Sequence, residues 1–116
     1  MRRGLPRMKE FELALGSPVI LYLQNPKEKV WGLLVSLESA GVVVRAIDLA
    51  TFDDWMRQEA RGEERVLGLT TLFYPLGRVE KMERDETVGP VESYCDRFAR
   101  EVGKTVRQAL GLDALN

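Results

Sequence analysis

The stretch from Lys29 to Asp48 constrains the fold most, because it has the composition of two β-strands joined by a tight turn. Its first half is dense in Val, Leu and Trp, which suits a strand that is covered on both faces or forms a curled barrel wall. Ser39–Gly41 supplies the turn, and Val42–Val44 then resumes a β-branched pattern that resists helix. Gly32 interrupts the first strand, which indicates barrel curvature or, as the alternative, room for a ligand.

Further apolar runs predict the remaining strands. Asn25–Glu28 is the turn that leads into the hairpin, and Pro75 breaks strand pairing because it has no backbone N–H to donate. The last strand is rich in charge, which is typical of a sheet edge. The three predicted strands outside the hairpin are Pro18–Gln24, Leu67–Tyr74 and Arg78–Asp85.

Helical spacing appears in three places. Phe52, Trp55 and Met56 share one face of a helix that begins after Thr51 and ends at Gly62, and we expect this face to pack on the barrel. A short N-terminal helix is predicted by Met8, Phe11 and Leu15, although the alternation of Phe11, Leu13 and Leu15 would also suit a strand. A C-terminal helix is predicted to begin at a capping box of Ser93 and Asp96 and to end at Gly111, and its apolar positions are Tyr94, Phe98, Val102, Val106 and Leu110.

These elements predict a mainly β fold in one domain, residues 1–116. We expect a small, strongly bent, five-stranded antiparallel barrel over about residues 8–86, with a short N-terminal helix, a helical insert and a C-terminal helix over about 93–110. No apolar run approaches the roughly 18 residues of a membrane span, and the start has no signal-peptide core. With a single cysteine, this indicates a cytoplasmic protein without an intrachain disulfide.

The residue inventory argues against catalysis. The chain has 0 histidines, so Ser/His and Cys/His nucleophile pairs cannot form, and no phosphate-binding glycine motif occurs. Cys95 is interpreted as a structural thiol, and Asp48, Asp53 and Asp54 as helix-capping or solvated residues, with a hard-cation site as the alternative. The sequence therefore predicts no enzyme activity, no cofactor and no metal.

The net charge of -1 gives no overall electrostatic case for nucleic acid. A local patch remains open, because Met1–Lys9 carries four cations and no acid. Arg45 and Arg78 are weak candidates for phosphate contacts, and Trp31 for base stacking, beside the plainer interpretation of solvated arginines and a core tryptophan.

The order of these elements resembles that of the Sm-like small barrels, over roughly Met8–Glu86. The resemblance rests on the glycine in the second strand and on the strand-Pro-strand ending. The segments that show it are Pro18–Leu23, Val30–Leu34 and Phe73–Val79. It implies an SH3-like bent barrel that forms rings by edge-strand pairing, with RNA as a frequent ligand. The chain departs from the family at Ala46–Ala50, where the RNA-contact stretch of eukaryotic and archaeal members would stand, and it lacks the later Arg-Gly pair and the bacterial Tyr-Lys-His. No RNA-contact residue is carried over.

We therefore expect a non-catalytic Sm-like binding or assembly module that forms a homo-oligomer, with RNA as a candidate ligand. Period-2 geometry sends Leu67, Leu69 and Phe73 to one face of their strand and Leu72 and Tyr74 to the other, so both faces need a cover. The candidate oligomer-contact residues are Phe73, Tyr74, Val79 and Met82. The alternative is a protein-binding scaffold or regulatory subunit with no nucleic-acid role.

Overall fold

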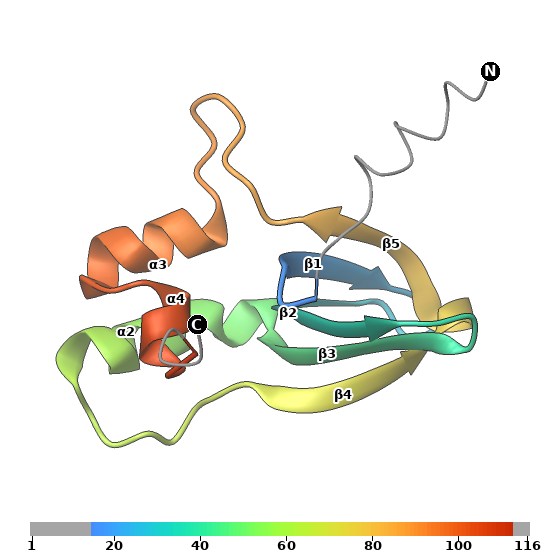
Figure 1. Ribbon diagram of the computed structural model, residues 1–116, viewed down its shortest axis with the longest axis horizontal. Helices are drawn as coiled ribbons and strands as arrows, with labels where there is room; N and C mark the ends of the chain where they lie inside the picture. The colour runs from blue at the N-terminus through green and yellow to red at the C-terminus, as the bar shows by residue number, and fades with distance from the viewer. Residues whose placement is uncertain (1–14, 113–116) are drawn as a thin grey trace.

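A computed structural model describes residues 15–112 as one curved antiparallel sheet with helices at one end (Figure 1). The five strands have the order β4-β3-β2-β1-β5. Their bounds are β1 Pro18–Leu23, β2 Glu28–Leu37, β3 Gly41–Asp48, β4 Thr70–Pro75 and β5 Val79–Arg84. The helical elements are η1 Leu49–Thr51, α2 Phe52–Arg61, η2 Leu76–Arg78, α3 Tyr94–Val102 and α4 Val106–Ala109.

The predicted five-strand antiparallel succession is confirmed, but the sheet is not closed into a barrel within the described residues. In that part of the chain β4 pairs with β3 alone, and β5 pairs with β1 alone. The short helix η2 carries the chain from one outer strand to the other. The predicted N-terminal helix and the basic segment Met1–Lys9 lie outside the described residues, apart from Leu15, which is exposed.

Two hydrophobic cores lie on opposite faces of the sheet because successive strand residues alternate between faces. The inner core is built from strand residues alone, and its buried members are Val19, Leu21, Leu23, Val30, Leu34, Val42, Val44 and Ala46. The outer core joins the other face to the helices. Its strand members are Ile20, Trp31, Leu33 and Ile47, and its helical members include Phe52, Trp55, Met56, Phe98 and Val106.

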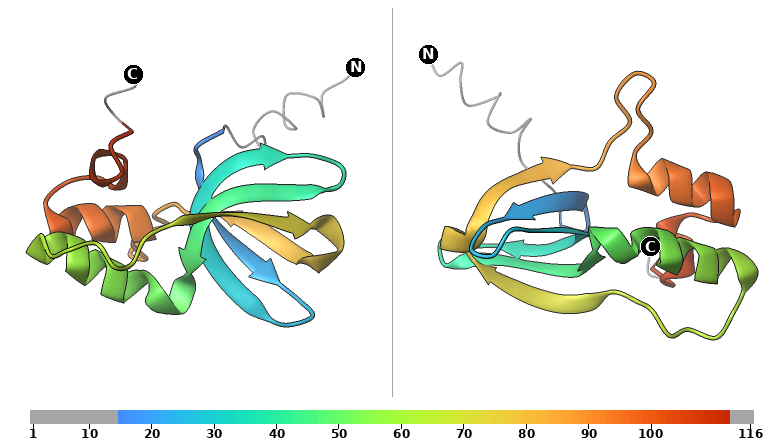
Figure 2. Two further views of the ribbon diagram at one scale, coloured as in Figure 1. Left: turned by 90° about the horizontal axis from the view of Figure 1, so that it is seen from below. Right: turned by 180° about the vertical axis from the view of Figure 1, so that it is seen from behind.

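The sheet is curved (Figure 2), and the pairing of β2 with β3 leaves no room for a side chain at Gly32. Gly32 lies opposite Ala46, and a Cβ on Gly32 would stand 2.6 Å from the Ala46 Cβ. A register shift between Leu34 and Ser36 marks a bulge further along β2. These features agree with the predicted curvature at Gly32 and argue against room for a ligand there, because Arg45 and Ala46 fill the space that a Cβ would take.

Helix α2 confirms the predicted insert. Phe52, Trp55 and Met56 are all buried in the outer core, with Trp55 only 1% exposed. The Trp55 ring centroid lies 6.0 Å from that of Trp31 on β2. Thr51 occupies the N-cap without a side-chain hydrogen bond, and Gly62 ends the helix in the left-handed conformation, as predicted.

The prediction of a single long C-terminal helix is wrong, because the segment forms two helices, α3 and α4. Gly103 adopts a φ of 89°, which ends α3, and Thr105 begins α4 with a capping box to Gln108. The predicted start of α3 is confirmed, since Ser93 Oγ accepts a hydrogen bond from the Asp96 backbone N–H at 3.0 Å. The break lets Val106 turn into the outer core beside Phe98.

Candidate functional site

The unpaired sides of β4 and β5 are one candidate site. The residues that point from these strands into the inner core are half-buried, whereas those on β1, β2 and β3 are at most 2% exposed. We call the half-buried set the edge residues: Leu72, Tyr74, Val79 and Met82. Three of the four predicted contact residues are therefore edge residues. The sheet leaves the inner core least covered along these two strands.

Phe73, the fourth predicted contact residue, points to the opposite face and is 54% exposed. Its ring covers Gly41, where an added Cβ would lie 2.8 Å from it. Leu67 and Leu69 pack on the outer core while Leu72 and Tyr74 pack on the inner core, as the period-2 argument predicted. Leu67 and Leu69 precede β4, because the strand begins only at Thr70.

The structure gives the three weak RNA candidates different environments. Trp31 is 0% exposed, so the stacking hypothesis for this residue is wrong: its ring lies in the outer core and offers no face to a base. Arg78 donates to the backbone oxygens of Gln24 and Pro26 at 3.0 and 2.7 Å, and this contact holds the β1–β2 turn against η2. Arg45 is exposed on β3, opposite Thr71 of β4.

A second candidate site is centred on Tyr22 of β1. The sheet register places Tyr22 between Lys29 of β2 and Lys81 of β5. The Lys81 Nζ lies 4.5 Å from the centroid of the Tyr22 ring, and the Lys29 Nζ lies 5.4 Å from it. Two ammonium groups therefore approach one aromatic ring, a geometry that favours cation–π attraction.

Two hollows flank this ring, and both are lined by Tyr22, Lys29 and Leu49. The larger, about 440 Å³, also includes Lys27, Glu80 and Ala50. The smaller, about 320 Å³, extends toward the start of α3, and its further lining includes Glu83, Val88, Val91 and Tyr94. We call the ring, Lys27, Lys29, Lys81 and the two hollows the Tyr22 surface.

The Tyr22 surface keeps its lysines free of close ion pairs. Within residues 15–112, no carboxylate oxygen lies within ion-pair distance of Lys27, Lys29 or Lys81. The Tyr22 hydroxyl donates to Glu83 Oε1 at 2.8 Å, and this hydrogen bond raises the pKa of Tyr22. The phenol is therefore neutral at pH 7, and the cations remain available to an anionic ligand.

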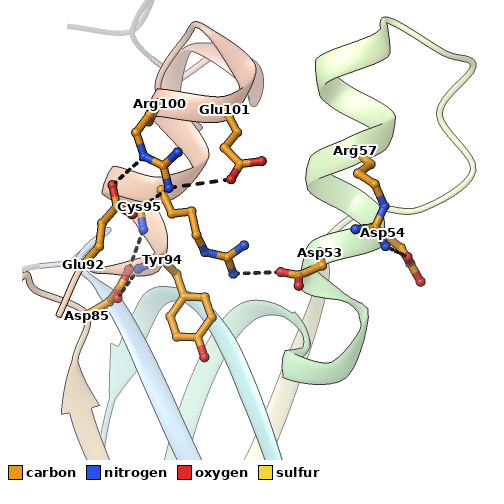
Figure 3. Close-up of polar contacts among 10 residues, drawn as sticks. Asp53, Asp54, Arg57, Asp85, Glu92, Tyr94, Cys95, Arg100 and Glu101 are labelled. Carbon is orange, nitrogen blue, oxygen red and sulfur yellow. Dashed lines mark hydrogen bonds and ion pairs between the residues drawn. The ribbon is translucent and has the colours of Figure 1, made fainter.

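Asp85 connects the sheet to α3 and was not singled out by the sequence. Its buried carboxylate accepts a hydrogen bond from Trp31 Nε1 at 3.0 Å. It also accepts hydrogen bonds from the backbone N–H groups of Tyr94 and Cys95 at 2.8 and 2.9 Å (Figure 3). Negative charge at a helix N-terminus is favourable. Burial, together with the nearby Asp85 charge, raises the pKa of Cys95 to about 12. The thiol is protonated at neutral pH, which agrees with its interpretation as structural.

The aspartates considered for a cation serve other contacts. Asp53 pairs with Arg97 at 2.7 Å, and Asp54 pairs with Arg57 one turn along α2 (Figure 3). Asp48 is exposed at the end of β3. Among residues 15–112, no three His, Cys, Asp or Glu side chains are grouped so that they could hold a metal ion.

Comparison with protein-family models, curated proteins and solved structures finds no match to this chain. Across the described helices, none is both long and apolar enough to span a bilayer. We therefore infer a function from the geometry of the two candidate sites.

Proposed function

We propose that this chain is a non-catalytic, Sm-like assembly module that associates with further copies of itself through the free sides of β4 and β5. The observation that carries the proposal is the incomplete cover of the inner core along these two strands. A strand of a second copy would supply both the missing backbone partners and the missing apolar cover.

The free sides of β4 and β5 have the length and apolar composition needed to pair with each other between two copies. Each is six residues long, and each has apolar edge residues on the inner face. Since β4 and β5 differ in sequence, joining the β5 of one copy to the β4 of the next is a head-to-tail contact that closes into a ring when the rotation permits. The charged residues of β5, Glu80, Lys81, Glu83 and Arg84, would disfavour indiscriminate sheet growth.

A charge at the β5 edge is expected to dissociate the assembly. Met82→Lys would place an ammonium group where the proposal requires an apolar contact, so the oligomer should give way to monomer at tens of micromolar protein. Size-exclusion chromatography with light scattering measures the mass, and circular dichroism checks the fold. Val35→Lys, on an exposed residue of β2, is the matched control and should keep the wild-type mass.

Hydrogen exchange tests the same proposal without a mutation. The backbone amides of β4 and β5 should become more protected as the protein concentration rises, while those of the central strands β2 and β3 should not change. A wild-type chain that is a strict monomer at tens of micromolar, with concentration-independent protection, would overturn the proposal.

A second function, binding of single-stranded RNA, is favoured by the Tyr22 surface. An aromatic ring with cations beside it can stack a base while the lysines neutralise phosphate. Carboxylates also line the hollows, Glu28 and Glu80 in the larger and Glu83, Asp85, Glu86 and Glu92 in the smaller, and they would limit the affinity. We therefore propose weak, salt-dependent binding at this place rather than at Trp31.

Lys29→Glu and Lys81→Glu are expected to weaken RNA binding at every base sequence. Each loss of one phosphate contact should reduce the slope of log affinity against log salt by about 0.7. Fluorescence anisotropy with labelled oligo(A) and oligo(U) at low salt provides the measurement, and Lys104→Glu, between α3 and α4, is the control. If the wild-type chain binds neither oligonucleotide at high protein concentration, the protein-binding scaffold becomes the better interpretation.

A further inference from the structure

A small hairpin between β5 and α3 exposes two valines, which also line part of the smaller hollow beside Tyr22. Val88 and Val91 exchange backbone hydrogen bonds of 2.9 Å in both directions, with Gly89 and Pro90 as the turn. Their side chains are 64% and 68% exposed. The hairpin projects beyond the sheet and α3 (Figure 1). Because the backbone is paired, this exposure belongs to an ordered element, and both valines are presented to solvent or to a partner.

A third exposed valine, Val66, lies in the segment that precedes β4. Val66 is 82% exposed, although its backbone is fixed by the buried side chain of Gln58. The Gln58 Oε1 accepts from the N–H groups of Val66 and Leu67 at 2.9 Å, and its Nε2 donates to the Leu67 carbonyl at 2.9 Å. This segment therefore presents an apolar side chain from a fixed backbone, as the hairpin does.

The two features occupy corresponding positions on the two free strands. Val66 lies four residues before Thr70, the first residue of β4, and Val88 lies four residues after Arg84, the last residue of β5. Figure 1 shows that β4 runs away from the helical end and that β5 runs back toward it. Both valines therefore belong to the helical end of the molecule.

The relative orientation of two copies follows for one arrangement, a ring whose axis is parallel to β4 and β5. The rotation from one copy to the next then leaves the strand directions unchanged, so the β5 of one copy would lie antiparallel to the β4 of the next. The last residue of β5 then faces the first residue of β4. The chain beyond β5 and the chain before β4 continue past the joint on the same side, each with its exposed valine.

We propose that the Val88–Val91 hairpin of one copy packs on the Val66 segment of the next copy, as a second contact that extends the strand joint. This inference rests on the proposed self-association and names which further surface takes part in it. The contact would cover three exposed valines that the isolated chain leaves in water. It also sets the direction of assembly, because the hairpin and its receiving segment are different structures.

Dilution of three variants tests the contact. Val66→Ser, and Val88→Ser combined with Val91→Ser, should each raise the dissociation constant of the oligomer by about tenfold or more, since each removes buried apolar surface. Val35→Ser, on an exposed valine of β2, should leave it unchanged. Light scattering across a dilution series gives the constants, and thermal unfolding confirms that each variant is folded.

Cross-linking tests the contact by a gain of signal, which a loss of folding stability in a variant cannot produce. An equimolar mixture of Val66→Cys and Val88→Cys chains, treated with a short bis-maleimide, should give linked pairs that contain one chain of each kind. A wild-type monomer would overturn the proposed function itself. A wild-type oligomer whose dissociation constant is unchanged in the valine variants, and which gives no mixed cross-link, would overturn the hairpin contact alone.

Discussion

Trp31→Ala is expected to lower the free energy of unfolding by about 3–5 kcal/mol, which is a large share of the stability of an ordinary small domain. Trp31 is 0% exposed, and its ring centroid lies 5.1 Å from that of Phe52 and 6.0 Å from that of Trp55. Alanine would leave a cavity between the sheet and α2. It would also remove the indole N–H from Asp85, a buried acceptor.

Urea unfolding followed by circular dichroism measures the effect, and Trp31→Phe separates its two causes. Phenylalanine keeps much of the ring volume but cannot donate to Asp85, so we expect a loss of only about 1–3 kcal/mol. Val35→Ala, on an exposed residue of the same strand, should change the free energy of unfolding by less than about 0.5 kcal/mol. If Trp31→Ala were as stable as the wild type, the outer core would not be what joins the helices to the sheet.

The result also bears on the Tyr22 surface and on the Val88–Val91 hairpin. Trp31 and Asp85 hold the end of β5 against the start of α3, beside the hollow that includes Glu83 and Tyr94. The Val88–Val91 hairpin lies between these two elements. Loosening this junction would therefore be expected to disturb the Tyr22 surface and the hairpin together, although neither contains Trp31.

The sequence patterns correctly predicted those helices and strands that are determined by residues close together in the chain. The spacing of Phe52, Trp55 and Met56 identified α2 and its buried face, and Ser93 identified the start of α3. The strand order along the chain followed from β-branched runs separated by turns. Each of these features depends on residues within a few positions of one another, so one sequence was enough to find them.

The break between α3 and α4 shows where a periodic pattern misleads. The apolar spacing from Tyr94 to Leu110 continues through Gly103, and a mid-helix glycine costs only about 1 kcal/mol, so the pattern favoured one helix. The signal against it was Thr105 followed by Gln108, which form a capping box. Thr105 and Gln108 are the same kind of N-terminal signal as Ser93 and Asp96, and together they predict that a second helix begins after Thr105.

The candidate sites depend on contacts between distant residues, which a single sequence does not reveal. Alternation places Tyr22 on the outer face, but only the register brings Lys29 and Lys81 to its ring. Composition likewise left Trp31 as either a core or a stacking residue, and packing assigns it to the core. Barrel closure is the same kind of question, because it depends on whether β4 and β5, at the two ends of the strand order, come together.

Gly32→Ala should be comparably damaging, because the added methyl group would meet backbone rather than flexible side chains. The alanine Cβ would stand 2.6 Å from the Ala46 Cβ and 2.7 Å from the Ala46 Cα, and the Arg45 carbonyl oxygen is closer still. Strands β2 and β3 would have to separate at the Gly32–Ala46 pair. We expect a loss of about 3 kcal/mol or more in the free energy of unfolding.

Gly77→Ala is the matched control for this substitution. Gly77 lies in η2, and among the described residues no neighbouring atom lies within 4 Å of the position that an added methyl group would take. Alanine should therefore be neutral or slightly stabilising there, through its lower entropy when unfolded. Urea unfolding of both variants, followed by circular dichroism, makes the comparison.

A Gly32→Ala chain as stable as Gly77→Ala would mean that β2 and β3 separate at little cost. The close approach at Gly32 would then not be what curls the sheet.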